Sequence, residues 1–170
     1  MALSETASKR SSVFQNLPRH VLAPVPLPLL QPILGRIVRG AARNRPELFS
    51  RLGPHQGKTY LIDPLNMPFV FLLTPNPASP RLRACRRGRN VAHDARIAGT
   101  FLTLLDMIDG RLDGDALFFT RDLIIEGDTE AVVVLRNALD DLDGSIADEI
   151  AAPFGPVARA ALSALRRIRT

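Results

Sequence analysis

The sequence contains no tryptophan, a single tyrosine, a single cysteine and no long uninterrupted apolar run. A lone cysteine cannot form an internal disulfide, so Cys85 gives no indication of an oxidising compartment. A bilayer-spanning helix needs about 18 to 20 consecutive apolar residues, and prolines interrupt the longest candidate stretch, Val21 to Leu34. The same prolines make this stretch a poor secretory signal. We therefore expect a cytoplasmic protein whose contact with membranes is at most peripheral.

The residues that are present favour one aliphatic core. The apolar fraction is 46%, and the aromatic residues are mainly phenylalanine, of which there are eight. A chain of 170 residues can bury one sizeable core and does not need a second. The sequence therefore predicts one domain with additional helices, and its interior suits an apolar cavity.

The net charge of +5 is distributed unevenly, because residues 1–100 and 155–170 are basic whereas residues 101–154 are acidic. Basic ends could face anionic lipid or nucleic acid, but neutralisation between neighbouring parts of one fold accounts for most of these charges. The strongest nucleic-acid signal is the arginine-rich run Arg81 to Arg89. No aromatic side chain interleaves with these arginines to stack on bases, so we expect no nucleic-acid partner.

Changes in pattern divide the chain into four parts. Residues 1–15 are polar without an apolar period, which predicts a disordered tail. Residues 16–52 form an N-terminal helical segment, in which an amphipathic helix with a basic side ends near Asn44 and Pro46 opens a short second helix. Residues 53–144 form the main domain. Residues 145–170 form C-terminal helices, the last of them basic and amphipathic.

Within the main domain, short apolar runs bounded by turn residues predict strands. They are Lys58 to Ile62, Phe69 to Thr74, Arg81 to Arg86, His93 to Ile97 and Leu123 to Glu126. Helical spacing predicts a helix over Phe101 to Ile108 and another from Glu130 to about Leu142, with Asp128 or Thr129 as its cap. Phe69 to Thr74 is apolar on both faces, so we expect it inside the sheet or covered on its second face.

One stretch resembles a known family. Asp94-Ala95-Arg96-Ile97-Ala98-Gly99-Thr100, followed by a helix, Leu117-Phe118-Phe119 and then Leu123-Ile124-Ile125-Glu126-Gly127-Asp128-Thr129, is similar to the sterol carrier protein 2 (SCP2) domain. In that family a late apolar strand runs into Glu-Gly-Asp and a helix. The segment Asp115 to Glu130 more narrowly resembles the bacterial UbiT accessory factors, which join a proline-bearing helical segment to such a domain.

The resemblance implies an α+β fold with a twisted, mostly antiparallel sheet of about five strands, covered by helices on one face, with a lipid tunnel between them. It also implies a lipid-carrying role in oxygen-independent ubiquinone biosynthesis. The expected partners are an isoprenoid quinone intermediate or another lipid, hydroxylases of the same pathway, a second copy of the chain, and, transiently, an anionic membrane surface. No cofactor is expected.

By the same resemblance, the apolar side chains that cover the sheet line the lipid site, although core packing would explain each of them equally well. They are Phe101, Leu104, Leu105, Phe118, Phe119, Leu135 and Leu139. Four polar residues are candidate headgroup contacts. They are Thr100, Thr103, Thr120 and Arg121.

Catalytic chemistry finds little support in the sequence. His20, His55 and His93 are isolated from one another and from any nucleophile at a useful spacing. The acidic residues between Asp106 and Asp115 do not follow a calcium-loop pattern, so we expect no metal site and no catalytic residue. The alternatives left open are a protein-scaffolding module, a phospholipid or fatty-acid carrier unrelated to quinones, and, third, an esterase-like enzyme.

Overall fold

The computed structural model describes residues 26–109, 123–140, 155, 156, 160 and 163. Its sheet has five strands in the order β3-β2-β1-β4-β5. The strands are β1 (Tyr60–Pro64), β2 (Phe69–Thr74), β3 (Arg81–Arg86), β4 (Ala95–Gly99) and β5 (Ile124–Gly127). Neighbouring strands are antiparallel except for β1 and β4, which are parallel. This arrangement confirms the expected α+β fold with a mostly antiparallel sheet.

The strand bounds agree closely with those predicted. β2 and β3 have the predicted limits, β1 and β4 are displaced by two residues, and β5 by one. β2 lies between β3 and β1 and pairs with both, so it is an interior strand of the sheet. The expected interior position of this strand is therefore confirmed.

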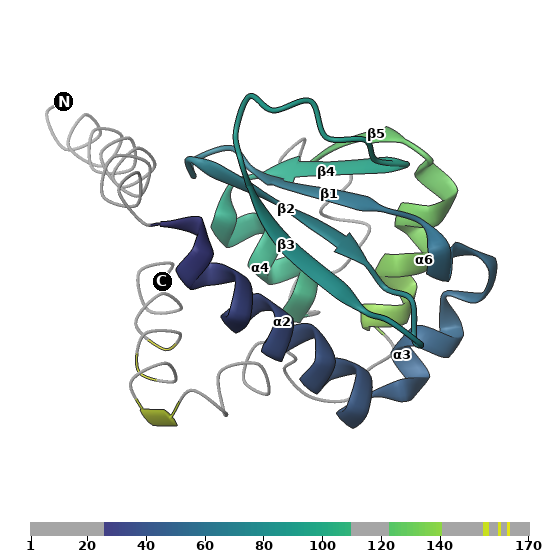
Figure 1. Cartoon of the computed structure of the whole chain (residues 1–170). Coiled ribbons are helices and arrows are strands. Elements are labelled where there is room, and N and C mark those ends of the chain that lie inside the picture. The colour runs from purple at the N-terminus through teal and green to yellow at the C-terminus, as the bar shows by residue number, and fades with distance from the viewer. Residues whose placement is uncertain (1–25, 110–122, 141–154, 157–159, 161–162, 164–170) are drawn as a thin grey trace, which may run out of the picture.

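The helices gather on one face of the sheet. They are α2 (Leu27–Asn44), α3 (Pro46–Arg51), the short 3-10 helix η1 (Gly53–Gly57), α4 (Phe101–Asp109) and α6 (Thr129–Asp140). Figure 1 shows α2 running beside β3, while α4 and α6 lie against the sheet near β4. No helix in the described ranges is both long enough and apolar enough to span a membrane.

α2 begins at Leu27, although Pro28 and Pro32 both lie within it. Pro28 occupies the first turn, where a missing N–H removes no helical hydrogen bond. Pro32 lies inside the helix and removes one bond there. The opposite face of α2 offsets this loss by packing: Leu34 and Val38 are buried, and the Gln31 side chain donates to the Ala84 carbonyl of the edge strand β3 at 2.8 Å.

One core unites the N-terminal helices with the sheet. Leu48, Phe49 and Leu52 belong to the same buried cluster as Tyr60 of β1 and Val132 of α6. The predicted division of the chain at residue 52 therefore does not separate two cores. The predicted tail and the Leu117–Thr120 run lie outside the described residues, as does most of the predicted C-terminal helical region.

A network of ion pairs lies on the face of the sheet that is opposite the helices. Asp63 is buried, and its carboxylate accepts hydrogen bonds from Arg87 at 2.5 Å and from Arg96 at 2.6 Å. Arg96 also bonds Glu126 of β5 at 2.6 Å, so the network crosses β1, β4 and β5. Burial alone would raise the pKa of Asp63, but the hydrogen bonds from Arg96 and Arg87 outweigh it and hold that pKa below its ordinary value.

Candidate functional site

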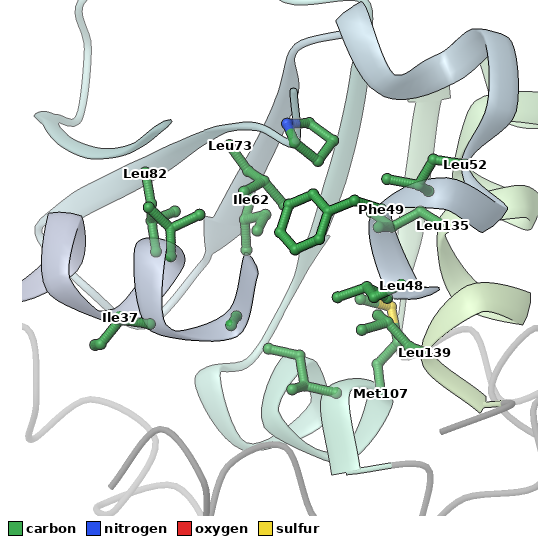
Figure 2. A pocket seen from close by; sticks show the side chains of 14 residues that line it. Ile37, Leu48, Phe49, Leu52, Ile62, Leu73, Leu82, Met107, Leu135 and Leu139 are labelled. Carbon is green, nitrogen blue, oxygen red and sulfur yellow. The ribbon is translucent and has the colours of Figure 1, made fainter. Parts of the chain in front are cut away.

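An apolar cavity of about 140 Å³ lies between the sheet and the helices (Figure 2). Among the described residues, every one that lines it is apolar, and this lining comes from α2, α3, α4, α6 and three strands. The residues are Ile37, Val38, Ala41, Leu48, Phe49, Leu52, Ile62, Leu73, Pro75, Leu82, Met107, Ile108, Leu135 and Leu139.

One side of α2 forms part of the cavity wall. Ile37, Val38 and Ala41 stand at helical spacing on the face that turns toward the sheet. Arg36 and Arg39 lie on the other side of the helix and are exposed. α2 is therefore a wall with an apolar inner side and a basic outer side.

α3 places Phe49 in the middle of the site. The Phe49 side chain is 3% exposed, and Figure 2 shows its ring extending from α3 toward Ile62 and Leu73. The carbonyl of Phe49 accepts a hydrogen bond from the Gln56 side chain at 2.8 Å, which ties the end of this short helix to η1. The position of the ring sets the free space that remains in the cavity.

The strands contribute one alternate row of side chains. Leu73 of β2 pairs with Leu82 of β3 on one side and with Tyr60 of β1 on the other. Side chains two residues apart in a strand share a face, so Ile62 joins Leu73 and Leu82 beneath the helices. The cavity floor is therefore an aliphatic patch of the sheet.

α6 closes the site, and its first turn is firmly anchored. The Asp128 carboxylate accepts the Ala131 backbone N–H at 3.0 Å and pairs with Lys58 at 3.2 Å. The Ala131 hydrogen bond, followed by the Lys58 contact, lowers the pKa of Asp128. The predicted cap at Asp128 is thus confirmed, and it orients Leu135 and Leu139 toward the cavity.

The structure brings together only part of the predicted lining. Leu135 and Leu139 line the cavity. Leu104 is buried in the adjoining core cluster, and Phe101 and Leu105 are partly buried on α4, but none of these three lines it. Phe118, Phe119, Thr120 and Arg121 lie outside the described residues.

The two described headgroup candidates occupy the start of α4. Thr100 Oγ1 lies 2.7 Å from Thr103 Oγ1 and accepts the Thr103 backbone N–H at 3.1 Å. This is an N-terminal cap of the helix, and neither threonine lines the cavity. Their contact with a headgroup stays a prediction.

Sequence reasoning missed the contributions of α2, α3 and the strands. The signal was present, because an amphipathic helix that ends near Asn44 and a short second helix that begins at Pro46 were both predicted. These helices were assigned to a separate segment, however, and their apolar faces were not connected to the site. For the strands, alternation shows which side chains share a face, but it does not show which face borders a cavity.

The chemistry of the cavity suits hydrocarbon. A trapped water needs two to four polar partners, and no polar side chain lines this cavity within the part of the chain that the structure describes. Its volume is close to that of a cavity of about 150 Å³ that takes up one benzene. Each CH₂ group moved there from water gains about 0.8 kcal/mol.

The described histidines lie away from the cavity lining. His93 is exposed, with Nδ1 at 2.7 Å from the Val91 carbonyl. The backbone carbonyl of His55 lies 3.5 Å from the Tyr60 hydroxyl. Neither histidine faces a nucleophile across the cavity among the residues that the structure describes, since the lining side chains there are apolar.

Comparisons with known proteins bear on the fold and the family. The sequence matches no curated protein closely enough to identify a relative. A solved structure described as a UbiJ-SCP2 ubiquinone synthesis protein shares the fold, with a TM-score of 0.53 and 16% identity over 66% of this chain and 90% of that one. The apo sterol carrier protein 2 of Yarrowia lipolytica gives a TM-score of 0.45 and 8% identity, over 65% of this chain and 86% of that one.

The sequence model of the SCP-2 sterol transfer family matches residues 39–140. The match starts inside α2 and ends with α6, so it includes all five strands and nearly the whole cavity lining. It also spans more than half of the chain. The protein therefore belongs to the SCP-2 sterol transfer family.

Proposed function

We propose that this protein is a non-catalytic lipid carrier that holds the hydrocarbon tail of a lipid in the cavity between α2, α3, α6 and the sheet. The observation that carries the proposal is the lining itself, which is apolar from every described element that reaches it. Membership of a sterol transfer family supports the same function. A catalytic role would need polar groups at the site, and the described lining offers none.

The energetics favour exchange rather than permanent storage. A tail of ten carbons gains roughly 8 kcal/mol on leaving water, yet it gains almost nothing on leaving a bilayer, whose interior is equally apolar. The cavity as it stands holds a group about the size of one isoprene unit. A longer tail needs more room, and rotation of the central Phe49 ring would supply it between Ile62 and Leu135.

For the lipid, we propose a prenylated ubiquinone precursor, used in oxygen-independent ubiquinone biosynthesis beside separate hydroxylases. The segment Asp115 to Glu130 resembles the UbiT accessory factors, and the fold is shared with a protein described as acting in ubiquinone synthesis. A prenylated phenol combines a long apolar tail with a small polar ring. The tail suits the cavity, and the ring would remain accessible to an enzyme.

Native mass spectrometry of the purified protein, with extraction of whatever lipid copurifies, tests this function. We expect a bound prenylated phenol, and uptake of added prenylated phenol by the emptied protein. Leu139→Trp on α6 and Ala41→Phe on α2 should fill the cavity from opposite walls and abolish uptake. Val133→Trp is the matched control, because Val133 lies on the same helix as Leu139 but is 39% exposed.

The outcomes separate the alternatives. Uptake of phospholipid or fatty acid but of no prenylated phenol would retain the carrier function and overturn the quinone assignment. A protein that takes up no lipid at all, or cavity-filled variants that fold normally and bind as well as Val133→Trp, would overturn the carrier function. Thermal unfolding of each variant identifies any that lost binding only because it failed to fold.

A further inference from the structure

Met107 supplies the one side-chain heteroatom of the described cavity lining. It lies in the last turn of α4, is 5% exposed and borders the cavity. Figure 2 shows its side chain reaching from α4 toward Leu48 and Leu139. Every other side chain of the described lining consists of carbon and hydrogen only. The thioether sulfur of Met107 is therefore the reactive atom that a molecule held there would meet.

A thioether reduces peroxides, because its sulfur accepts one oxygen and becomes a sulfoxide. Hydrogen peroxide is poorly suited to this cavity, since the described lining offers no polar partner to a small polar molecule. An alkyl hydroperoxide is better suited. Each carbon of its hydrocarbon part raises its concentration in an apolar site by about fourfold relative to water.

We propose that the cavity takes up alkyl hydroperoxides and that Met107 reduces them to alcohols. The sulfur lone pair attacks the terminal peroxide oxygen, the O–O bond breaks, and the alkoxide leaves with the hydroperoxide proton as an alcohol. Sulfur gains the terminal oxygen and is oxidised by two electrons, which the peroxide bond accepts. Each chain consumes one hydroperoxide, until a sulfoxide-reducing enzyme restores the thioether.

The sulfoxide changes what the cavity can hold. Its oxygen is polar, and no side chain of the described lining can donate a hydrogen bond to it. A hydrocarbon tail beside this oxygen would leave it without any partner, which is unfavourable. The oxidised chain should therefore hold a tail about tenfold more weakly. This consequence rests on the proposed function, whereas the oxidation itself does not.

Met67 is a control within the same molecule. It is 7% exposed, nearly as buried as Met107, but it does not line the cavity. Trypsin separates the two methionines, because Arg81 and Arg96 lie between them, so peptide mass spectrometry measures each oxidation rate. Cys85 is a free thiol and is alkylated beforehand, since thiols also consume peroxides.

The oxidation is tested with two peroxides. The four carbons of tert-butyl hydroperoxide favour the cavity, and the loss of water around its polar end offsets part of this gain. We expect this reagent to oxidise Met107 about tenfold faster than Met67, and hydrogen peroxide to oxidise both at similar rates. A prenyl alcohol of one isoprene unit, which competes for the same space, should slow the oxidation of Met107 and leave that of Met67 unchanged.

The effect on lipid carriage is tested within each variant, by lipid uptake before and after treatment with tert-butyl hydroperoxide. The wild type and Met67→Leu should lose uptake by about tenfold. Met107→Leu has no thioether at the cavity, so its uptake should be the same before and after treatment. Exchange of methionine for leucine nearly conserves volume, and thermal unfolding shows whether each variant is folded.

Several outcomes would overturn the hydroperoxide proposal. They are equal oxidation of Met67 and Met107 by tert-butyl hydroperoxide, a rate at Met107 that the prenyl alcohol does not change, and an equally large preference for Met107 with hydrogen peroxide. Equal losses of uptake in Met107→Leu and the wild type would refute its effect on carriage. A chain that carries lipid but has an unreactive Met107 would refute the reduction and leave the proposed function intact. Selective oxidation of Met107 in a chain that takes up no lipid would do the reverse.

Discussion

Gly127 lies directly against the backbone carbonyl of Asp94, and a side chain at position 127 would collide with that oxygen. Gly127 also has a φ of +81°, in the left-handed region that side chains disfavour. The next residue, Asp128, donates its backbone N–H to the same carbonyl at 2.9 Å. The glycine of the Glu-Gly-Asp motif therefore permits the end of β5 to lie close beside the start of β4.

Gly127→Ala should lower the free energy of unfolding by about 2 to 3 kcal/mol, because it combines a strained φ with a collision against backbone. Gly40→Ala is the control. Gly40 lies inside α2 with no atom near its missing Cβ, so alanine there should raise stability by about 0.5 to 1 kcal/mol. Urea unfolding measures both, and an unchanged midpoint for Gly127→Ala would contradict the close approach.

Asp63 is expected to be the most sensitive member of the ion network. Asp63→Ala leaves Arg87 and Arg96 without their shared carboxylate and should cost about 3 kcal/mol of folding free energy. Glu126 bonds the same Arg96, but its side chain is 58% exposed, so Glu126→Gln should cost less than about 1 kcal/mol. Equal effects in urea unfolding would show that burial does not distinguish the two carboxylates.

The same network predicts a pH dependence. The folded pKa of Asp63 is below its ordinary value of 3.8, so the unfolded chain takes up the proton first on acidification. The stability that this carboxylate contributes is present above pH 3.8 and is lost as pH falls through the folded pKa. Urea unfolding across this acidic range should show a smaller loss for Asp63→Asn than for the wild type. A loss of the same size in both would exclude Asp63 as its source.

Phe49 controls the size of the cavity. Phe49→Ala should destabilise the empty protein by about 3 to 5 kcal/mol, and prenyl alcohols of increasing length should restore part of this loss, since binding to the folded state stabilises it. Val132→Ala is the control, because Val132 is 1% exposed in the core but does not line the cavity. Thermal shifts measure both variants. Rescue of both to the same degree would mean that the alcohols act elsewhere.

The sheet was predictable from the sequence for a physical reason. Turn residues border β2 and β3 on both sides, so the strand-forming residues end where the chain has to turn. The start of α2 was less predictable, because Pro28 and Pro32 suggest a break that tertiary packing of Leu34 and Val38 overrides. Local patterns thus located the elements well wherever local and tertiary preferences coincide.

The cavity was predictable only in part. Periodicity shows which side of a helix is buried, as for Leu135 on α6 and Val38 on α2, but it does not show which two buried sides face each other. The pairing of α2 with β3, through the Gln31 contact with Ala84, is a tertiary choice that leaves no local pattern. The lining from α2 and α3 was therefore missed, while that from α6 was anticipated.

The pKa of Tyr60 tests how well the core excludes water, because no other residue contributes to the signal. It is fully buried in β1, and its hydroxyl donates to the Ala131 carbonyl at 3.3 Å. Burial, followed by the nearby carboxylates of Asp128 and Asp94, raises its pKa from 10.0 to about 12. As Tyr60 is the single tyrosine and tryptophan is absent, phenolate absorbance reports this residue alone.

We expect the folded protein to titrate near pH 12, and the urea-unfolded chain near pH 10. A raised folded pKa means that the neutral phenol is the form the fold favours. Its contribution to stability is thus complete below pH 10 and is lost as pH rises toward 12. Tyr60→Phe supplies the blank, since it should show no phenolate signal and no such loss. A folded-state midpoint near pH 10 would mean that the Tyr60 hydroxyl reaches water, and that α6 does not seal the end of the core where Ala131 lies.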